Sequence, residues 1–123
     1  MFHIQHILIY QLTYSYIFLT QFQGEWALYS CSMLSAALAN ISTTYPDTRE
    51  ENLRSMEQLI EIVLSPELRR YDAMRWGEDS LESLDGDKSH VSYLSHLAWM
   101  ICGYKRVGGD GATMSCSPRS APR

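Results

Sequence analysis

Most of the residues that could do chemistry lie between Tyr71 and His90. This polar segment combines an Arg, a Trp and a His with six carboxylates. The acids are Asp72, Glu78, Asp79, Glu82, Asp85 and Asp87. Long segments that connect rigid elements often carry function. Two carboxylates beside an aromatic ring suit chemistry on a sugar or another small molecule, because one acid donates a proton, one accepts it and the ring supports the substrate.

We therefore single out six residues. The candidate catalytic residues are Asp72, Glu78 and His90, and the candidate substrate-binding residues are Arg75, Trp76 and Tyr93. The competing interpretation is a solvated acidic loop in which Asp85-Gly86 forms a turn and Ser89 caps the next helix. The sequence does not decide between these two interpretations.

Neither a metal site nor a cofactor is predicted. An EF-hand loop that began at Asp85 would need glycine at its sixth position and an acid at its twelfth, but His90 and His96 stand there. The chain has no HExxH motif, phosphate loop or GxSxG motif. His96 is interpreted as a core histidine with a satisfied ring, and His90, beside the acids, as the better functional candidate.

The three cysteines, Cys31, Cys102 and Cys116, form no CxxC pair and are an odd number. This pattern indicates neither a disulfide framework nor a zinc site. Cys31 and Cys102 lie in apolar helical patterns, so both are predicted to pack as small hydrophobic residues.

Charge and the N-terminal segment limit the possible partners. A net charge of −4 disfavours a nucleic-acid-binding protein, which would carry a basic surface. Residues 1–22 are apolar and aromatic, but they lack the basic start and cleavage site of a signal peptide, and polar residues interrupt them too often for a membrane span. We interpret 1–22 as a helix or a disordered arm. The sequence leaves open whether this arm belongs to the natural domain, and it predicts no compartment.

Residues 23–110 have the pattern of a helical unit. Helices are expected near 25–42, 47–64 and 89–107, with a short helical turn at 66–71 and a long loop at 72–88. Asp47 and Glu50 form a capping-box pattern, Ser65-Pro66 restarts the chain as a cap with proline at the first helical position, and Gly108-Gly109 ends the last helix.

The first and last of these helices are apolar nearly all round, whereas the helix at 47–64 has one apolar face. Alternating inner and outer helices are what a double-layered helical ring requires. We therefore predict an all-α fold, a partial α/α toroid with irregular N- and C-terminal extensions. One amphipathic helix cannot cover two apolar ones, so an exposed apolar patch and self-association are expected.

The Gly108-Gly109-Asp110 turn is expected to precede another helix. Instead, 111–123 contains two prolines and no periodicity. We expect this tail to be disordered, and we expect the chain to be a fragment that lacks the remainder of its parent.

Three phrases resemble an uncharacterised group of bacterial all-helical proteins. They are GEWALYSCSML at 24–34, SPELRRYDAMRWGED at 65–79 and HVSYLSHLAWMICGYKRVGGD at 90–110. That group is similar to the α/α-toroid families, with linalool dehydratase-isomerase as a distant characterised member. The resemblance implies a toroid-like parent but no catalytic residue, because no catalytic motif matches.

Three functions remain open at this point. The first is a fragment without independent activity. The second is a hydrolase, lyase or isomerase of a carbohydrate or small molecule that uses the acidic segment in its full-length form. The third is a helical interaction module.

Overall fold

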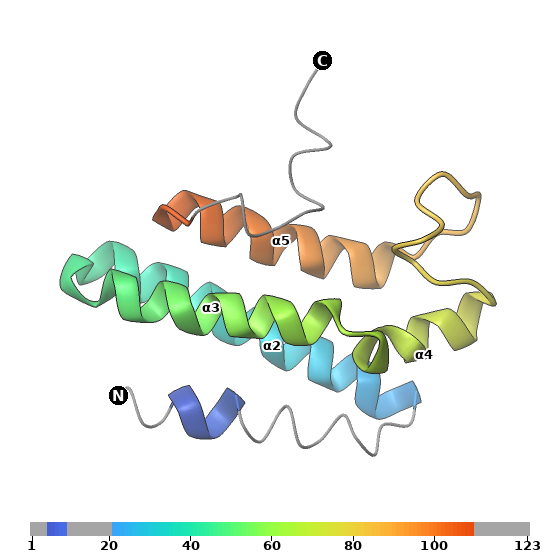
Figure 1. Ribbon diagram of the computed structural model, residues 1–123, viewed down its shortest axis with the longest axis horizontal. Helices are drawn as coiled ribbons and strands as arrows, with labels where there is room; N and C mark the ends of the chain where they lie inside the picture. Colours follow the sequence, from blue (N-terminus) through green and yellow to red (C-terminus); the bar gives the residue numbers. More distant parts are fainter. Residues whose placement is uncertain (1–4, 10–20, 110–123) are drawn as a thin grey trace.

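The computed structural model describes residues 5–9 and 21–109, and within them every regular element is helical (Figure 1). A helical turn at 5–9 is followed by the elements α2 (Gln21–Thr44), η2 (Pro46–Thr48), α3 (Arg49–Leu64), α4 (Pro66–Trp76) and α5 (Val91–Val107). The all-α prediction is confirmed. The expected disorder of 111–123 lies outside the described residues, as does most of the 1–22 arm.

The long helix α2 is central, because it packs against α3, α4 and α5. Figure 1 shows α2, α3 and α5 side by side, with α4 at one end of the group. The face of α2 toward these neighbours buries Leu28, Cys31 and Leu38, none of which is more than 1% exposed. Where α2 crosses α4, Gly24 leaves room for Tyr71, since a Cβ at position 24 would lie 2.9 Å from the Tyr71 Cβ.

The amphipathic helix α3 covers the group with Met56, Leu59 and Val63, all fully buried. The predicted capping box is wrong, because Thr48 is the N-cap of α3 and no side-chain cap bond forms. Residues 46–48 form a 3-10 helix instead, so Asp47 lies within that helix and is not the N-cap of α3.

The described part of the N-terminal arm contacts α3 through Gln5. Its amide nitrogen donates to Asn52 Oδ1 at 3.2 Å, and its amide oxygen accepts from Ser55 Oγ at 3.1 Å. All three residues are at most 5% exposed. The turn at 5–9 is therefore fastened to the helical group by a buried polar network.

The start of α4 agrees with the prediction, because Ser65 Oγ accepts from the backbone N–H of Leu68 and Pro66 occupies the first turn. The predicted end is wrong, since the helix continues to Trp76 and ends at Gly77 with φ +77°. Residues 66–76 carry no continuous apolar stripe. For this reason the periodicity of the sequence predicted only a short helical turn at 66–71. Burial of Leu68 and Tyr71 against the other helices extends the helix past Tyr71.

The last helix, α5, starts later than expected. His90, not Ser89, is the N-cap, and it adopts the left-handed conformation with φ +46°. The glycine exit is confirmed, because Gly108 has φ +112° and Gly109 N–H donates to Tyr104 O at 2.9 Å. His90 is unusual in this respect, because a non-glycine residue at positive φ is uncommon and persists only where its surroundings hold it.

No described helix is both long and apolar enough to cross a membrane.

Candidate functional site

Three predicted catalytic residues meet at the junction of α4, the following loop and α5. His90 Nδ1 lies 2.5 Å from Asp72 Oδ2, and His90 Nε2 lies 2.8 Å from Glu78 Oε2. The side chains of His90 and Asp72 are 2% and 3% exposed, whereas that of Glu78 is 27% exposed. We call Asp72, Glu78 and His90 the carboxylate–histidine centre.

Local structure explains how residues 18 positions apart meet. Asp72 lies on α4, near its C-terminal end, and the left-handed Gly77 reverses the chain so that Glu78 follows beside it. The loop then returns to His90, immediately before α5. The positive φ of His90 is therefore tied to a ring that is held on both sides by carboxylates.

These contacts set the protonation state of the ring. Burial alone would lower the pKa of His90, but the hydrogen bonds to Glu78 and Asp72 outweigh it and raise the pKa above the ordinary value. Both nitrogens can donate together only in the imidazolium form. The raised pKa and the two contacts therefore favour the imidazolium form of the ring between the carboxyl groups of Asp72 and Glu78.

A second ion pair, which the sequence analysis missed, fastens the same loop. Arg69 on α4 holds Asp79 with two bonds, Nε to Oδ1 at 2.7 Å and Nη2 to Oδ2 at 2.8 Å. The bond to Arg69 lowers the pKa of Asp79. Asp79 Oδ1 also accepts from Leu81 N–H at 3.1 Å, so it closes a turn. No spacing rule links an arginine on a helix to an acid ten residues later in a loop.

The predicted substrate-binding residues do not form one group. The Trp76 ring lies 5.8 Å from the His90 ring, so it borders the carboxylate–histidine centre. Arg75 pairs with Glu25 on α2 at 2.9 Å and is 43% exposed. Tyr93 is fully buried and donates to Val63 O at 2.6 Å, which is the position of a core residue.

The acids farther along the loop stay outside the centre. Glu82, Asp85 and Asp87 are exposed, as a solvated acidic loop would have them. Within 5–9 and 21–109, no group of His, Cys, Asp and Glu side chains is arranged to hold a metal ion. With both nitrogens engaged, the His90 ring has no free lone pair with which to accept a proton in this geometry.

A second candidate site lies on the surface of α2 and α5. The sequence predicted an exposed apolar patch but did not assign it to these residues. A row of rings crosses from α2 to α5, with centroids 6.0 Å apart for Trp26 and Tyr29, 4.9 Å for Tyr29 and His96, and 6.4 Å for His96 and Trp99. Helical periodicity places Met33, seven residues after Trp26, on the same side of α2. We call Trp26, Tyr29, Met33, His96 and Trp99 the aromatic face.

The aromatic face is open to solvent at three large side chains. Trp26 is 55% exposed, Met33 67% and Trp99 53%. His96 is satisfied, as predicted, by a 2.8 Å bond to Ser32 Oγ, although its ring is only half buried. Burial lowers the pKa of His96.

The two described cysteines differ. Cys31 is fully buried, and burial raises the pKa of its thiol to about 12. It therefore packs as an inert small hydrophobic residue, as predicted. Cys102 is exposed, so its predicted burial is wrong. The apolar pattern around it did not indicate that no described helix covers this side of α5.

No family model, curated protein or solved structure matches the chain.

Proposed function

We propose that the chain is a helical interaction module, built like a segment of an α/α toroid, and that its aromatic face pairs with the same face of a second copy. The observation that carries the proposal is the exposure of Trp26, Met33 and Trp99 on one surface of α2 and α5. Apolar surface grouped in this way marks interaction sites, whereas scattered exposed apolar residues are ordinary.

The carboxylate–histidine centre supports a structural role in this module. Its imidazolium is bound on both sides and buried, so it fastens the loop at 77–90 and the start of α5 to α4. Together with the Arg69–Asp79 pair, it fixes the end of the helical group. A fixed end helps to keep α2 and α5 in register beneath the aromatic face.

Pairing with a second copy fits the chemistry of this face. A two-fold symmetric contact joins a patch to itself, so the patch must be self-complementary. Indole, thioether and phenol side chains meet that requirement, because they carry no charge that would face its own copy. In a toroid-type parent, a neighbouring helix pair would occupy the same position, and the isolated chain would have no activity of its own.

Sedimentation velocity of the full chain tests the proposal through Met33→Glu. Met33 is exposed, so the substitution adds a charge to the aromatic face without removing core packing. The unaltered chain is expected to associate with rising concentration at micromolar levels. Met33→Glu should remain a monomer over the same range.

Met74→Glu is the matched control, because Met74 is 65% exposed and lies on α4, outside the aromatic face. It should associate as the unaltered chain does. A chain that stays monomeric without substitution, or equal association by both variants, would reject the proposal.

A second candidate function, acid–base chemistry on a small molecule, is favoured by the convergence of Asp72, His90 and Glu78 beside Trp76. In this alternative Glu78, the partly exposed member, would exchange protons with substrate while Asp72 orients the ring. A panel of nitrophenyl glycosides tests it. Hydrolysis that Glu78→Gln abolishes would favour the enzyme, and no hydrolysis by the unaltered chain would remove this candidate for sugars.

A further inference from the structure

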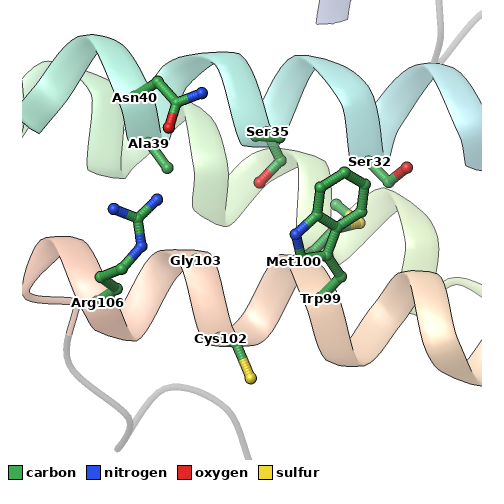
Figure 2. Close-up of a pocket in the computed structure, with 10 residues that line it drawn as sticks. Ser32, Ser35, Ala39, Asn40, Trp99, Met100, Cys102, Gly103 and Arg106 are labelled. Atoms are coloured by element: carbon green, nitrogen blue, oxygen red, sulfur yellow. The ribbon is translucent and has the colours of Figure 1, made fainter.

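A cavity of about 210 Å³ lies between α2 and α5, next to the aromatic face and on its Trp99 side. Its walls combine apolar and small side chains with the polar side chains of Ser32, Ser35, Asn40 and Arg106 (Figure 2). The apolar wall is formed by Trp99, Met100, Ala36 and Ala39. A cavity of roughly 150 Å³ is known to accept benzene, so this one has room for a single ring with a small substituent.

One buried polar atom in this cavity has no partner among the described residues. Ser35 is 1% exposed, and its hydroxyl forms no hydrogen bond within 5–9 and 21–109. Figure 2 shows the side chain directed from α2 into the space toward α5. A buried hydroxyl without a partner costs free energy, so such a group calls for an explanation, and a ligand atom is one.

A positive charge stands at the other end of the same cavity. Arg106 on α5 is exposed and forms no ion pair or hydrogen bond with any described residue, and Figure 2 shows its guanidinium directed toward Asn40 on α2. The Asn40 amide side chain likewise has no hydrogen bond to a described residue. A planar guanidinium beside an amide presents parallel donors, which match the two oxygens of a carboxylate.

We infer that this cavity binds a small organic carboxylate with a flat apolar body. The carboxylate lies against Arg106 and Asn40, the ring lies along the Trp99 indole, and the Ser35 hydroxyl bonds to a polar atom of the ligand. This site is independent of the carboxylate–histidine centre, since none of its lining residues belongs to that centre.

Phenylacetate is the probe, and the Met33→Glu chain is the receptor, because Met33 does not line the cavity and this variant removes self-association. Nuclear magnetic resonance is the readout. The chemical shifts of the Trp99 indole N–H and the Gly103 amide should change with phenylacetate concentration until the site is saturated. The chemical shift of the Trp76 indole N–H should not change. A dissociation constant on the order of 1 mM is expected for so small a ligand.

Substitutions then assign the polar contacts. Arg106→Met should weaken binding by about tenfold, since it removes a charge-assisted bidentate contact, whereas Arg106→Lys should lose less. Lys105→Met removes the neighbouring charge, which does not line the cavity, and should change nothing. Ser35→Ala should weaken binding and also raise the melting temperature of the free chain, because it removes an unsatisfied hydroxyl.

Three results would overturn the inference. The first is binding of 2-phenylethylammonium as tight as that of phenylacetate. The second is tighter binding of inorganic phosphate than of phenylacetate. The third is equal affinity of Arg106→Met and Lys105→Met for phenylacetate. Because the receptor is already monomeric, none of these outcomes depends on whether the aromatic face pairs with a second copy.

Discussion

At the scale of single residues, His90 has the most unusual environment in the described chain. It is buried and at positive φ, and its contacts favour the charged form of the ring, and each of these states is costly alone. The two carboxylates offset the burial of the charge, and the ring contacts hold the backbone. Such a centre stabilises the fold only while all its members are present, because removing one leaves another charge buried and unpaired.

His90→Asn should therefore lower the free energy of unfolding by about 3 kcal/mol, since Asp72 then loses its cationic partner. Urea denaturation of the monomeric Met33→Glu chain with and without the substitution measures this difference. His96→Asn is the control, because it removes one hydrogen bond from a half-buried ring and should cost only about 1 kcal/mol. Equal losses at the two positions would contradict the structural role of His90.

The pH dependence of the free energy of unfolding should report the charge state of the carboxylate–histidine centre. The pKa of His90 is raised in the folded chain, so its contribution is fully present below the ordinary histidine value of 6.5 and is lost as the pH rises through the raised folded pKa. The free energy of unfolding should thus fall above pH 6.5, by at most about 1.4 kcal/mol per pH unit.

The free energy of unfolding is measured by urea denaturation from pH 6 to pH 9 for two chains. One is Met33→Glu, and the other carries both Met33→Glu and His90→Asn. The stability difference between the two chains should shrink as the pH increases. A constant or growing difference would show that the ring is not charged in the folded state.

The sequence singled out Asp72, Glu78 and His90 because acids are concentrated before a histidine near a helix start. They could not show that both ring nitrogens are bound, since that depends on the turn at Gly77 and on the length of α4. The separation of Arg75 from the centre, and the core position of Tyr93, likewise depend on how α4 and α5 rotate against α2.

At the scale of the elements, close approach of helices decides where glycine is required. Gly24 and Gly103 both lie within helices, so alanine would gain intrinsic helix propensity at either position. Their surroundings differ. A Cβ at 24 meets the Tyr71 Cβ at 2.9 Å, whereas a Cβ at 103 meets only the Ala39 Cβ, at 3.8 Å.

Gly24→Ala should therefore destabilise the chain by about 1–3 kcal/mol, because α4 must move away from α2. Gly103→Ala should stabilise it by up to about 1 kcal/mol, since it adds helix propensity and only an ordinary contact. Thermal unfolding of both variants checks the opposite signs. Stabilisation by Gly24→Ala would show that α2 and α4 do not pack this closely.

Periodicity predicted the presence of α2, α3 and α5, because each has an apolar pattern that its neighbours bury, although the predicted cap of α3 was wrong. For α4 the Ser65-Pro66 start was predicted, but its length was not, because charged residues interrupt the apolar pattern and tertiary packing extends the helix to Trp76. The start of α5 also escaped prediction, because Ser89 is a common cap but the ring contacts of His90 fix the backbone one residue later.

At the scale of the whole molecule, the described helices bury a common core but leave the aromatic face without a cover. The sequence predicted such a patch from two helices that are apolar nearly all round, although it could not locate it. Its position follows from α3 and α4, which cover α2 on other sides and leave the surface shared with α5 open.

The concentration dependence of thermal unfolding tests this account most directly. Pairing through the aromatic face stabilises the folded chain by mass action, so the melting temperature should rise with protein concentration across the micromolar range. In Met33→Glu it should be lower and independent of concentration. A cooperative transition of the unaltered chain as a monomer, at one temperature over a hundredfold concentration range, would contradict the proposed interaction module.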